Sequence, residues 1–364
     1  MTRGFHDDGR ALGAKGRLSR WSLGLLLAAT LLLAGCEGTE EEGAGDNLDG
    51  QVVALETEAP LRAPAYQSTS GTLLAIAEDG EGIVRFEVEE PEGGLFAGPD
   101  EQDPRLVIAR GEDLEGEGAG ENIALDRFME GRAFVPQPEL DHIQSLQTDD
   151  LLQIRTFDAG EPASRVAMSG SQDAIYALST DGKAVTAVDL GTFKPVAEKR
   201  VDGSEQTLIE TSPEGGDEFW LAGPEGVSAH AFGTNPFPEG EVPLDAAALA
   251  VDAENAERAY ASETGTGRIV AVEPEGGEGL RVVEERDLGE EVLYLAAEPG
   301  LLHAVTPQRL VTLDAASLET IQSVELPPKA GGKPNGIAVG EEGVFVTLEG
   351  ERLVLLFSKP PTEE

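Results

Sequence analysis

The sequence predicts an all-β fold made of repeated four-stranded units, and three observations lead to this prediction. Aromatic residues are scarce, at 5% of the chain, while 45 of the 364 residues are glycine, which suits many turns and short strands. An aromatic or histidine residue recurs inside short apolar runs at successive spacings of 42, 44, 40, 43 and 42 residues: Phe134, Tyr176, Trp220, Tyr260, His303 and Phe345. Triplets of the form apolar–small–apolar precede these runs, centred on Ala124, Ala167, Ala250, Ala296 and Ala338, with an imperfect copy at Leu208-Ile209-Glu210. A period near 40 residues with four strands in each unit predicts a seven-bladed β-propeller of four-stranded antiparallel blades.

The clearest unit covers residues 163–201. Its four expected strands are residues 165–168, 174–179, 184–189 and 196–201. Asp181-Gly182-Lys183 lies between two alternating apolar runs, and Asp-Gly in that place predicts a tight hairpin, because both residues tolerate the positive φ of such a turn.

The remaining units are expected to begin near residues 64, 121, 206, 246, 292 and 334. In the first of them we expect strands at 65–68, 72–77, 82–88 and 105–110. The position that corresponds to the recurring aromatic residue falls near Ala75, and polar loops are expected at 89–104 and 111–121. The last shows only three strands, at 336–339, 343–348 and 352–358. Residues 51–56 are therefore predicted to supply its outer strand and to close the ring, which removes exposed sheet edges. The propeller would then span residues 51–358 and leave a C-terminal tail at 359–364.

The first 35 residues are typical of an export signal. They carry a net charge of +3, followed by an apolar stretch at 21–33 that is shorter than the roughly 20 residues of a membrane-spanning helix. The stretch ends in Leu33-Ala34-Gly35-Cys36, which resembles the bacterial lipobox, and Cys36 is the only cysteine. The resemblance implies cleavage before Cys36 and attachment of a diacylglycerol and an amide-linked fatty acid such as palmitate to it. The alternatives are an ordinary secretory signal or a signal anchor.

Because of the lipobox resemblance, we expect the protein to bind a membrane through the lipid on Cys36. Glu37, rather than the Asp that often marks inner-membrane retention, favours the outer membrane or the surface of the bacterial cell envelope. Residues 36–50 are acidic, rich in glycine and nearly free of apolar side chains, which predicts a flexible tether.

The charge of the chain narrows the set of partners. The whole chain has a net charge of −43, and because residues 1–35 contribute +3, the chain from Cys36 onward carries −46. Such a charge repels nucleic acid, which is therefore not expected as a partner. The same acid excess leads to the hypothesis that the protein is adapted to high salt.

Two strands of the repeat carry a family resemblance. Residues 174–179 (AIYALS) and 184–189 (AVTAVD), the latter repeated at 310–314 (LVTLD), are similar to the second and third strands of the YVTN-type propellers, a group that overlaps the NHL and quinoprotein-like propellers. The resemblance covers nearly all of residues 50–358 and implies the fold. It implies no particular activity, because propellers host many unrelated functions.

The catalytic motifs that a sequence reveals most readily are missing. The chain has no Cys-x-x-Cys-His haem site, no pair of histidines with the spacing of a zinc protease, no Gly-x-Ser-x-Gly elbow and no phosphate-binding loop. His303 occupies the aromatic place of its unit and is expected to be a packed residue.

One segment suggests a metal site. Pro334-Asn335-Gly336 at the start of an inner strand is similar to a segment of gluconolactonase-like propellers, in which an asparagine at the channel mouth helps to hold a divalent ion. Glu210 and Asn122 lie near the starts of other inner strands, and carboxylate and amide oxygens suit Ca²⁺. The alternative is ordinary turn chemistry, since Asn before Gly is common in turns.

Two functions are consistent with these patterns. The first is a lipid-anchored envelope propeller that binds a protein, polymer or ligand without catalysis and without a cofactor. The second is a propeller hydrolase or lyase with a divalent ion at the channel mouth, held by Asn122, Glu210 and Asn335.

Overall fold

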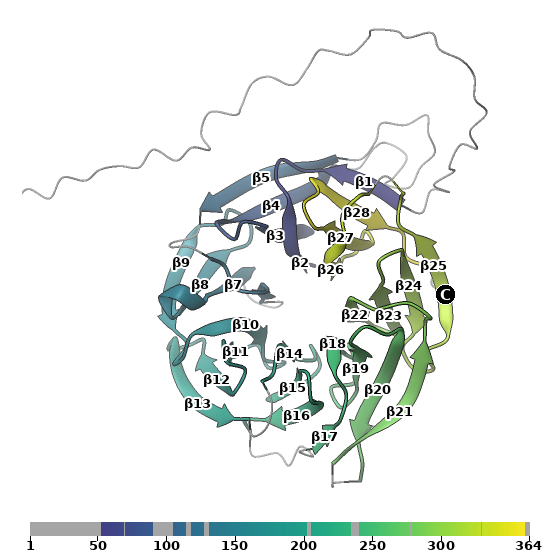
Figure 1. Cartoon of the computed structure of the whole chain (residues 1–364). Coiled ribbons are helices and arrows are strands. Elements are labelled where there is room, and N and C mark those ends of the chain that lie inside the picture. The colour runs from purple at the N-terminus through teal and green to yellow at the C-terminus, as the bar shows by residue number, and fades with distance from the viewer. Residues whose placement is uncertain are drawn as a thin grey trace, which may run out of the picture. The chain divides into compact units, whose positions relative to one another are not determined.

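The computed structural model describes residues 52–68, 70–89, 105–113, 118–126, 131–201, 205–233, 240–276, 279–328 and 330–360. It shows seven four-stranded antiparallel sheets arranged as blades of one ring (Figure 1), which confirms the predicted seven-bladed β-propeller. A single turn of 3-10 helix, Pro138–Leu140, is the one helical element in the described part of the chain. Nowhere in those residues is there a helix with the length and apolar character needed to cross a membrane.

The first three blades follow the chain from the inside of the ring to its rim. Blade 1 consists of β2 (Leu61–Gln67), β3 (Thr72–Ala77), β4 (Gly82–Glu89) and β5 (Arg105–Asp113). Blade 2 consists of β6 (Ala124–Leu125), β7 (Arg132–Gln137), β8 (His142–Gln147) and β9 (Gln153–Asp158). Blade 3 consists of β10 (Ala163–Met168), β11 (Ala174–Ser179), β12 (Ala184–Asp189) and β13 (Lys194–Arg200).

The next three blades repeat this order. Blade 4 consists of β14 (Leu208–Glu210), β15 (Glu218–Ala222), β16 (Val227–Ala231) and β17 (Gly240–Val242). Blade 5 consists of β18 (Ala246–Val251), β19 (Ala259–Glu263), β20 (Arg268–Pro274) and β21 (Leu280–Asp287). Blade 6 consists of β22 (Tyr294–Glu298), β23 (Leu301–Val305), β24 (Arg309–Asp314) and β25 (Thr320–Glu325).

Blade 7 joins the two ends of the propeller. Its inner three strands are β26 (Pro334–Val339), β27 (Val344–Leu348) and β28 (Leu353–Phe357), and its outermost strand is β1 (Val52–Glu56). The ladder between β1 and β28 is antiparallel and pairs Val52 with Phe357. The expected closure by an N-terminal strand is consistent with this sheet, in which purple β1 lies beside yellow β28 (Figure 1).

The strongest hairpin signal in the sequence corresponds to a tight turn in the structure. Gly182 has a φ of +66°, and a Cβ on it would lie 2.3 Å from the carbonyl oxygen of Gln206 in blade 4. Only glycine fits there, because the turn needs both the positive φ and the close approach. The flanking strands β11 and β12 have the predicted bounds, whereas β10 and β13 each begin two residues earlier than expected.

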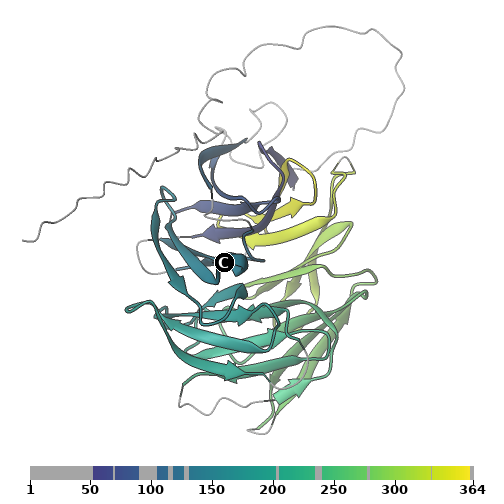
Figure 2. The same cartoon turned by 60° about the vertical axis from the view of Figure 1, so that its left-hand side comes forward.

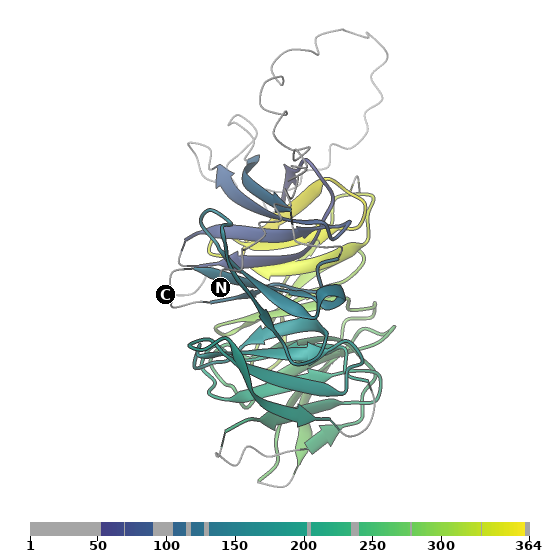
Figure 3. The same ribbon diagram turned by 90° about the vertical axis from the view of Figure 1, so that its left-hand side faces the viewer.

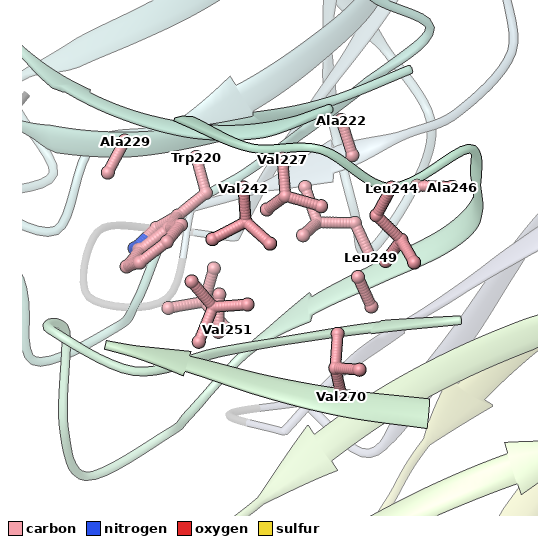
Figure 4. Close-up of a cluster of buried hydrophobic side chains, with 13 residues drawn as sticks. Trp220, Ala222, Val227, Ala229, Val242, Leu244, Ala246, Leu249, Val251 and Val270 are labelled. Carbon is pink, nitrogen blue, oxygen red and sulfur yellow. The ribbon is translucent and has the colours of Figure 1, made fainter. Parts of the chain in front are cut away.

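The hydrophobic core lies between blades rather than inside any one of them. Seven clusters of buried side chains fill the seven interfaces between adjacent blades, including the two that involve blade 7. Figure 4 shows the interface of blades 4 and 5, where Trp220 and Val227 face Leu249 and Val251 across the gap between the sheets. Each such side chain contributes roughly 1.5–3 kcal/mol when it is fully buried. Successive blades are therefore held face to face, as the side views show (Figures 2 and 3).

The outer strands share a local irregularity. Five of the seven, β5, β9, β13, β21 and β25, carry a register shift against their neighbour at the corresponding place. In β13 the bulged residue is Val196, which is 63% exposed. Such bulges twist an exposed strand edge and make it a poor template for pairing with another chain.

The acidic insertion of blade 1 is described only in part. Strand β5 extends to Asp113, three residues into the loop expected at 111–121. Residues 90–104 and 114–117 lie outside the described residues, as do the predicted signal peptide, Cys36 and the acidic tether.

Candidate functional site: the central cavity

The innermost strands place one equivalent residue of every blade around the centre of the ring. This residue pairs across the ladder with the aromatic place of the second strand, as Ala167 pairs with Tyr176 and Glu210 with Trp220. Six of the seven residues are alanines, and the seventh is Glu210. The alanines are Ala65, Ala124, Ala167, Ala250, Ala296 and Ala338. We call this set the alanine ring.

The register corrects two details of the sequence alignment. In blade 4 the repeat triplet is Ile209-Glu210-Thr211 rather than Leu208-Ile209-Glu210, so Glu210 occupies the small central place. In blade 1 the residue opposite the alanine of the ring is Leu74, one residue before Ala75. Both shifts arise where the unit lacks a typical marker, because no aromatic residue stands at 74 and no small residue stands at 210.

A cavity of about 270 Å³ lies against the alanine ring. Six of the seven blades contribute to its lining, and blade 5 does not. Most of the lining side chains are small or apolar, and Glu210 is the only one that carries an ionised group. The polar side chains Tyr66, Asn122, Gln172 and Thr211 complete the lining. Among the described residues, the lining of this cavity thus carries a single fixed negative charge.

Arg165 lies two residues before Ala167 on the inner strand of blade 3, and its positive charge interacts with Glu210 of the cavity lining. Its guanidinium lies 3.6 Å from the carboxylate of Glu121, which belongs to the stretch preceding β6. Burial lowers the pKa of Arg165 from its ordinary value, and the negative charges of Glu121 and Glu210 oppose that shift. One guanidinium therefore lies within the field of two carboxylates, and it does not itself line the cavity.

Asn122 lines the cavity but is bound to the neighbouring blade. Its side-chain nitrogen donates to the carbonyl of Val166 at 2.8 Å, and its side-chain oxygen accepts the Val166 N–H at 3.0 Å. The two bonds connect the start of blade 2 to the inner strand of blade 3. Both polar atoms of this amide have partners within the protein, so Asn122 acts as an inter-blade clamp.

Asn335 forms a weaker version of this clamp. It is the bulged residue of β26, and its side-chain nitrogen donates to the carbonyl of Leu61 in blade 1 at 3.0 Å. Its side-chain oxygen has no hydrogen-bond partner among the described residues. The two asparagines do not stand at equivalent places: Asn122 lies two residues before the ring alanine of its blade, and Asn335 lies three residues before Ala338.

The structure brings together two of the three residues proposed as metal ligands. Glu210 and Asn122 line the same cavity, and Asn335 is not part of that lining. Within the described ranges, no group of three or more His, Cys, Asp or Glu side chains is arranged to hold a metal ion. Sequence reasoning missed Arg165 and Ala65, but it found the other five ring alanines as the small centres of the repeat triplets. The one signal for the exceptional place of Glu210 was the imperfect triplet in blade 4.

His303 is packed, as expected, and it also belongs to a polar network. The ring is fully buried, with Nδ1 3.0 Å from the hydroxyl of Thr312 and Nε2 2.8 Å from Oε1 of Glu298. The other carboxylate oxygen of Glu298 accepts a hydrogen bond from the ammonium of Lys359 at 2.6 Å. Lys359 follows the last strand of blade 7, so the network connects the C-terminal segment to blade 6.

Comparison with protein families and with curated proteins adds no assignment: no family model matches the chain, and no curated protein matches it in sequence.

Proposed function

We propose that this protein is a lipid-anchored β-propeller of the bacterial cell envelope, related to the YVTN and NHL-like propellers, which binds a protein, polymer or small ligand without catalysing a reaction. The export signal and the sequence Leu33-Ala34-Gly35-Cys36 support the anchor. Residues 174–179 and 184–189 support the family.

One geometric observation favours a binding role for the anchored propeller. The chain enters the ring through β1, which is the outermost strand of blade 7. The inner strands, which line the central cavity, lie at the opposite side of the sheets from this point of entry. Loops held by a rigid scaffold are the usual place for recognition.

Metabolic labelling tests the anchor. A clickable fatty acid fed to cells that produce the protein should label the wild type and should not label the Cys36→Ala variant. Equal labelling of both proteins would exclude acylation at Cys36. Crosslinking in intact cells, followed by identification of the captured proteins, tests the binding role. The Cys36→Ala variant serves as the control, because it retains the propeller and lacks the lipid.

The second candidate is a hydrolase or lyase with a divalent ion at the channel. The observation that favours it is the shared position of Asn122 and Glu210 on the central cavity. Calorimetric titration with Ca²⁺, Mg²⁺ and Zn²⁺ distinguishes the two candidates. Heat that disappears in the Glu210→Gln variant supports the metal site, and no heat with any of the three ions removes it.

A further inference from the structure

We propose that copies of this protein associate head to tail, with the rim of blades 2 and 3 of one copy against the rim of blades 5 and 6 of the next. This inference goes beyond the proposed function. It depends neither on the lipid anchor nor on a ligand in the central cavity.

The first argument is the distribution of exposed apolar side chains. Among the side chains that the structure describes, six large apolar ones are exposed, and all six belong to these two pairs of blades. Grouping of such side chains, rather than single scatter, is typical of an interaction surface. The first rim patch consists of Leu140, Leu152, Ile154 and Val196, and the second rim patch of Val282 and Ile321.

Each patch is continuous across two blades. On the first, the guanidinium of Arg155 in β9 lies 4.5 Å from the ring centre of Phe193, the residue before β13. On the second, Arg286 of β21 donates a hydrogen bond to the hydroxyl of Thr320 in β25 at 3.4 Å. The outer strands of neighbouring blades therefore form one surface in each patch.

The second argument is the conformation of the outer strands. Ile154, Val196 and Ile321 are the bulged residues of β9, β13 and β25, and they are 44%, 63% and 49% exposed. A bulge re-aims its side chain and disrupts the strand edge. A partner would therefore contact these rims through side chains rather than through an added strand.

The third argument is charge. Strands β9 and β13 together carry four basic and two acidic residues, a net charge of +2. Strands β21 and β25 carry two basic and four acidic residues, a net charge of −2. Opposite charges attract the two patches to each other, whereas two copies of the same patch repel.

Some of these charges are balanced inside the molecule. Arg200 pairs with Glu161 at 2.7 Å and with Glu198 at 2.8 Å, and Glu285 pairs with Arg268 at 3.1 Å. Others are exposed and enter no ion pair within the described ranges, so they are open to a partner: Lys194 on the first patch, and Glu284 and Glu325 on the second.

A second copy of this chain supplies the complement of each patch. Strands β9 and β13 lie on one side of the ring and β21 and β25 on the other (Figure 1). A contact between unlike patches therefore leaves one patch of each copy free. Such a heterologous contact continues into a row unless its rotation closes a ring.

Sedimentation velocity of the full chain in about 1 M KCl tests the inference, because salt at this concentration screens the repulsion between copies. We expect the wild type to form species larger than a dimer as its concentration rises. Val196→Glu and Ile321→Glu each spoil one patch and should weaken association by roughly tenfold or more. An equimolar mixture of the two variants should form dimers and nothing larger, because each keeps one intact patch.

Three further measurements complete the design. Ala54→Glu adds the same charge at an exposed position of β1, outside both patches, and should associate like the wild type. Lys194→Glu alters an exposed side chain without an internal ion pair, so it should fold and should also weaken association. The melting temperature checks the folding of every variant. All the proteins share one N-terminal segment, so differences between them report the rims.

Three results would overturn the inference. They are a wild type that stays monomeric up to roughly 1 mM, association of both Glu variants at wild-type strength, and dimers formed by one Glu variant alone as readily as by the mixture. Acylation and crosslinking in intact cells are separate measurements, so the anchored scaffold can stand or fail independently.

Discussion

Asn122 and Asn335 hold neighbouring blades together with different numbers of hydrogen bonds, because the backbone that each of them faces differs. Asn122 meets both the N–H and the carbonyl of Val166. Asn335 meets the carbonyl of Leu61, and its side-chain oxygen has no hydrogen-bond partner among the described residues. Two hydrogen bonds therefore join blades 2 and 3 at Asn122, whereas one joins blades 7 and 1 at Asn335.

This difference predicts an order of stability. Asn122→Ala removes two bonds and leaves the Val166 groups without their partner, so it should lower the free energy of unfolding by about 1–3 kcal/mol. Asn335→Ala removes one bond and an oxygen without a partner, so its loss should be about 1 kcal/mol or less. Urea denaturation of the two variants measures both values. A larger loss for Asn335→Ala would contradict the assignment of clamps.

Glu298 is a second residue whose charge is held by its neighbours. Burial raises the pKa of Glu298, but hydrogen bonds from His303 and Lys359 lower it by more than burial raises it. The pKa therefore lies below its ordinary value of 4.5. A carboxyl group with a lowered pKa stabilises the folded state above its unfolded pKa. That contribution is lost as the pH falls through the folded pKa.

We therefore expect Glu298→Gln to cost about 1–2 kcal/mol near neutral pH and progressively less as the pH falls below 4.5. Thermal denaturation of wild type and variant across the acid range measures the difference. In the Lys359→Met background, the difference in stability between Glu298 and Glu298→Gln should be smaller, because one of the groups that lower the pKa of Glu298 is absent. A gap that widens with acid would show that the network does not act through the charge of Glu298.

At the level of strands and blades, local patterns were enough to predict much of the fold. Residues 174–179 and 184–189 alternate around Asp181-Gly182, and β11 and β12 have the predicted bounds. The repeat also predicted the seven units, and a unit that lacked one strand predicted the closing strand β1. In each case the signal lies within one hairpin or in the comparison of units.

The candidate site was less predictable, because its contacts join different blades. Glu210 belongs to the ring only by its register with Trp220, and that pairing shifted the expected triplet by one residue. Arg165 and Glu121 are 44 positions apart and meet only when blades 2 and 3 pack together. Asn335 and Leu61 are 274 positions apart and meet only when blade 7 packs against blade 1. A pattern within one stretch of sequence cannot predict contacts between residues of different blades.

Strand β1 provides a test at the same level. Deletion of residues 50–57 should sharply lower the melting temperature, because it removes the outer strand of blade 7 and exposes the edge of β28. A matched pair of point variants refines the test. Leu55 is fully buried, so Leu55→Asp should be strongly destabilising, whereas Ala54→Asp, at an exposed position of the same strand, should have little effect. An unchanged melting temperature in the deletion would mean that the ring does not need this strand.

The whole molecule carries far more negative charge than its ion pairs can balance. From Cys36 onward the net charge is −46, and self-repulsion of this size opposes the compact state. At 1 M salt the Debye length is about 3 Å, so exposed charges that are farther apart than this are largely screened from one another. We expect the melting temperature to rise through molar KCl, as measured by calorimetry. Sucrose at equal osmolality controls for solvent exclusion. A flat or falling response to KCl would contradict adaptation to high salt.

The pairing of β1 with β28 also fixes when the ring can close. Val52 is made early and Phe357 nearly last, so the outer strand of blade 7 must wait for almost the entire chain before it finds its partner. Until then the apolar side chains of blades 1 and 6 that pack against blade 7 in the folded protein lack these contacts. Pairing over so long a stretch of chain is intrinsically slow. The interval between synthesis of the first strand and synthesis of the last is therefore the period in which this protein is most exposed to aggregation.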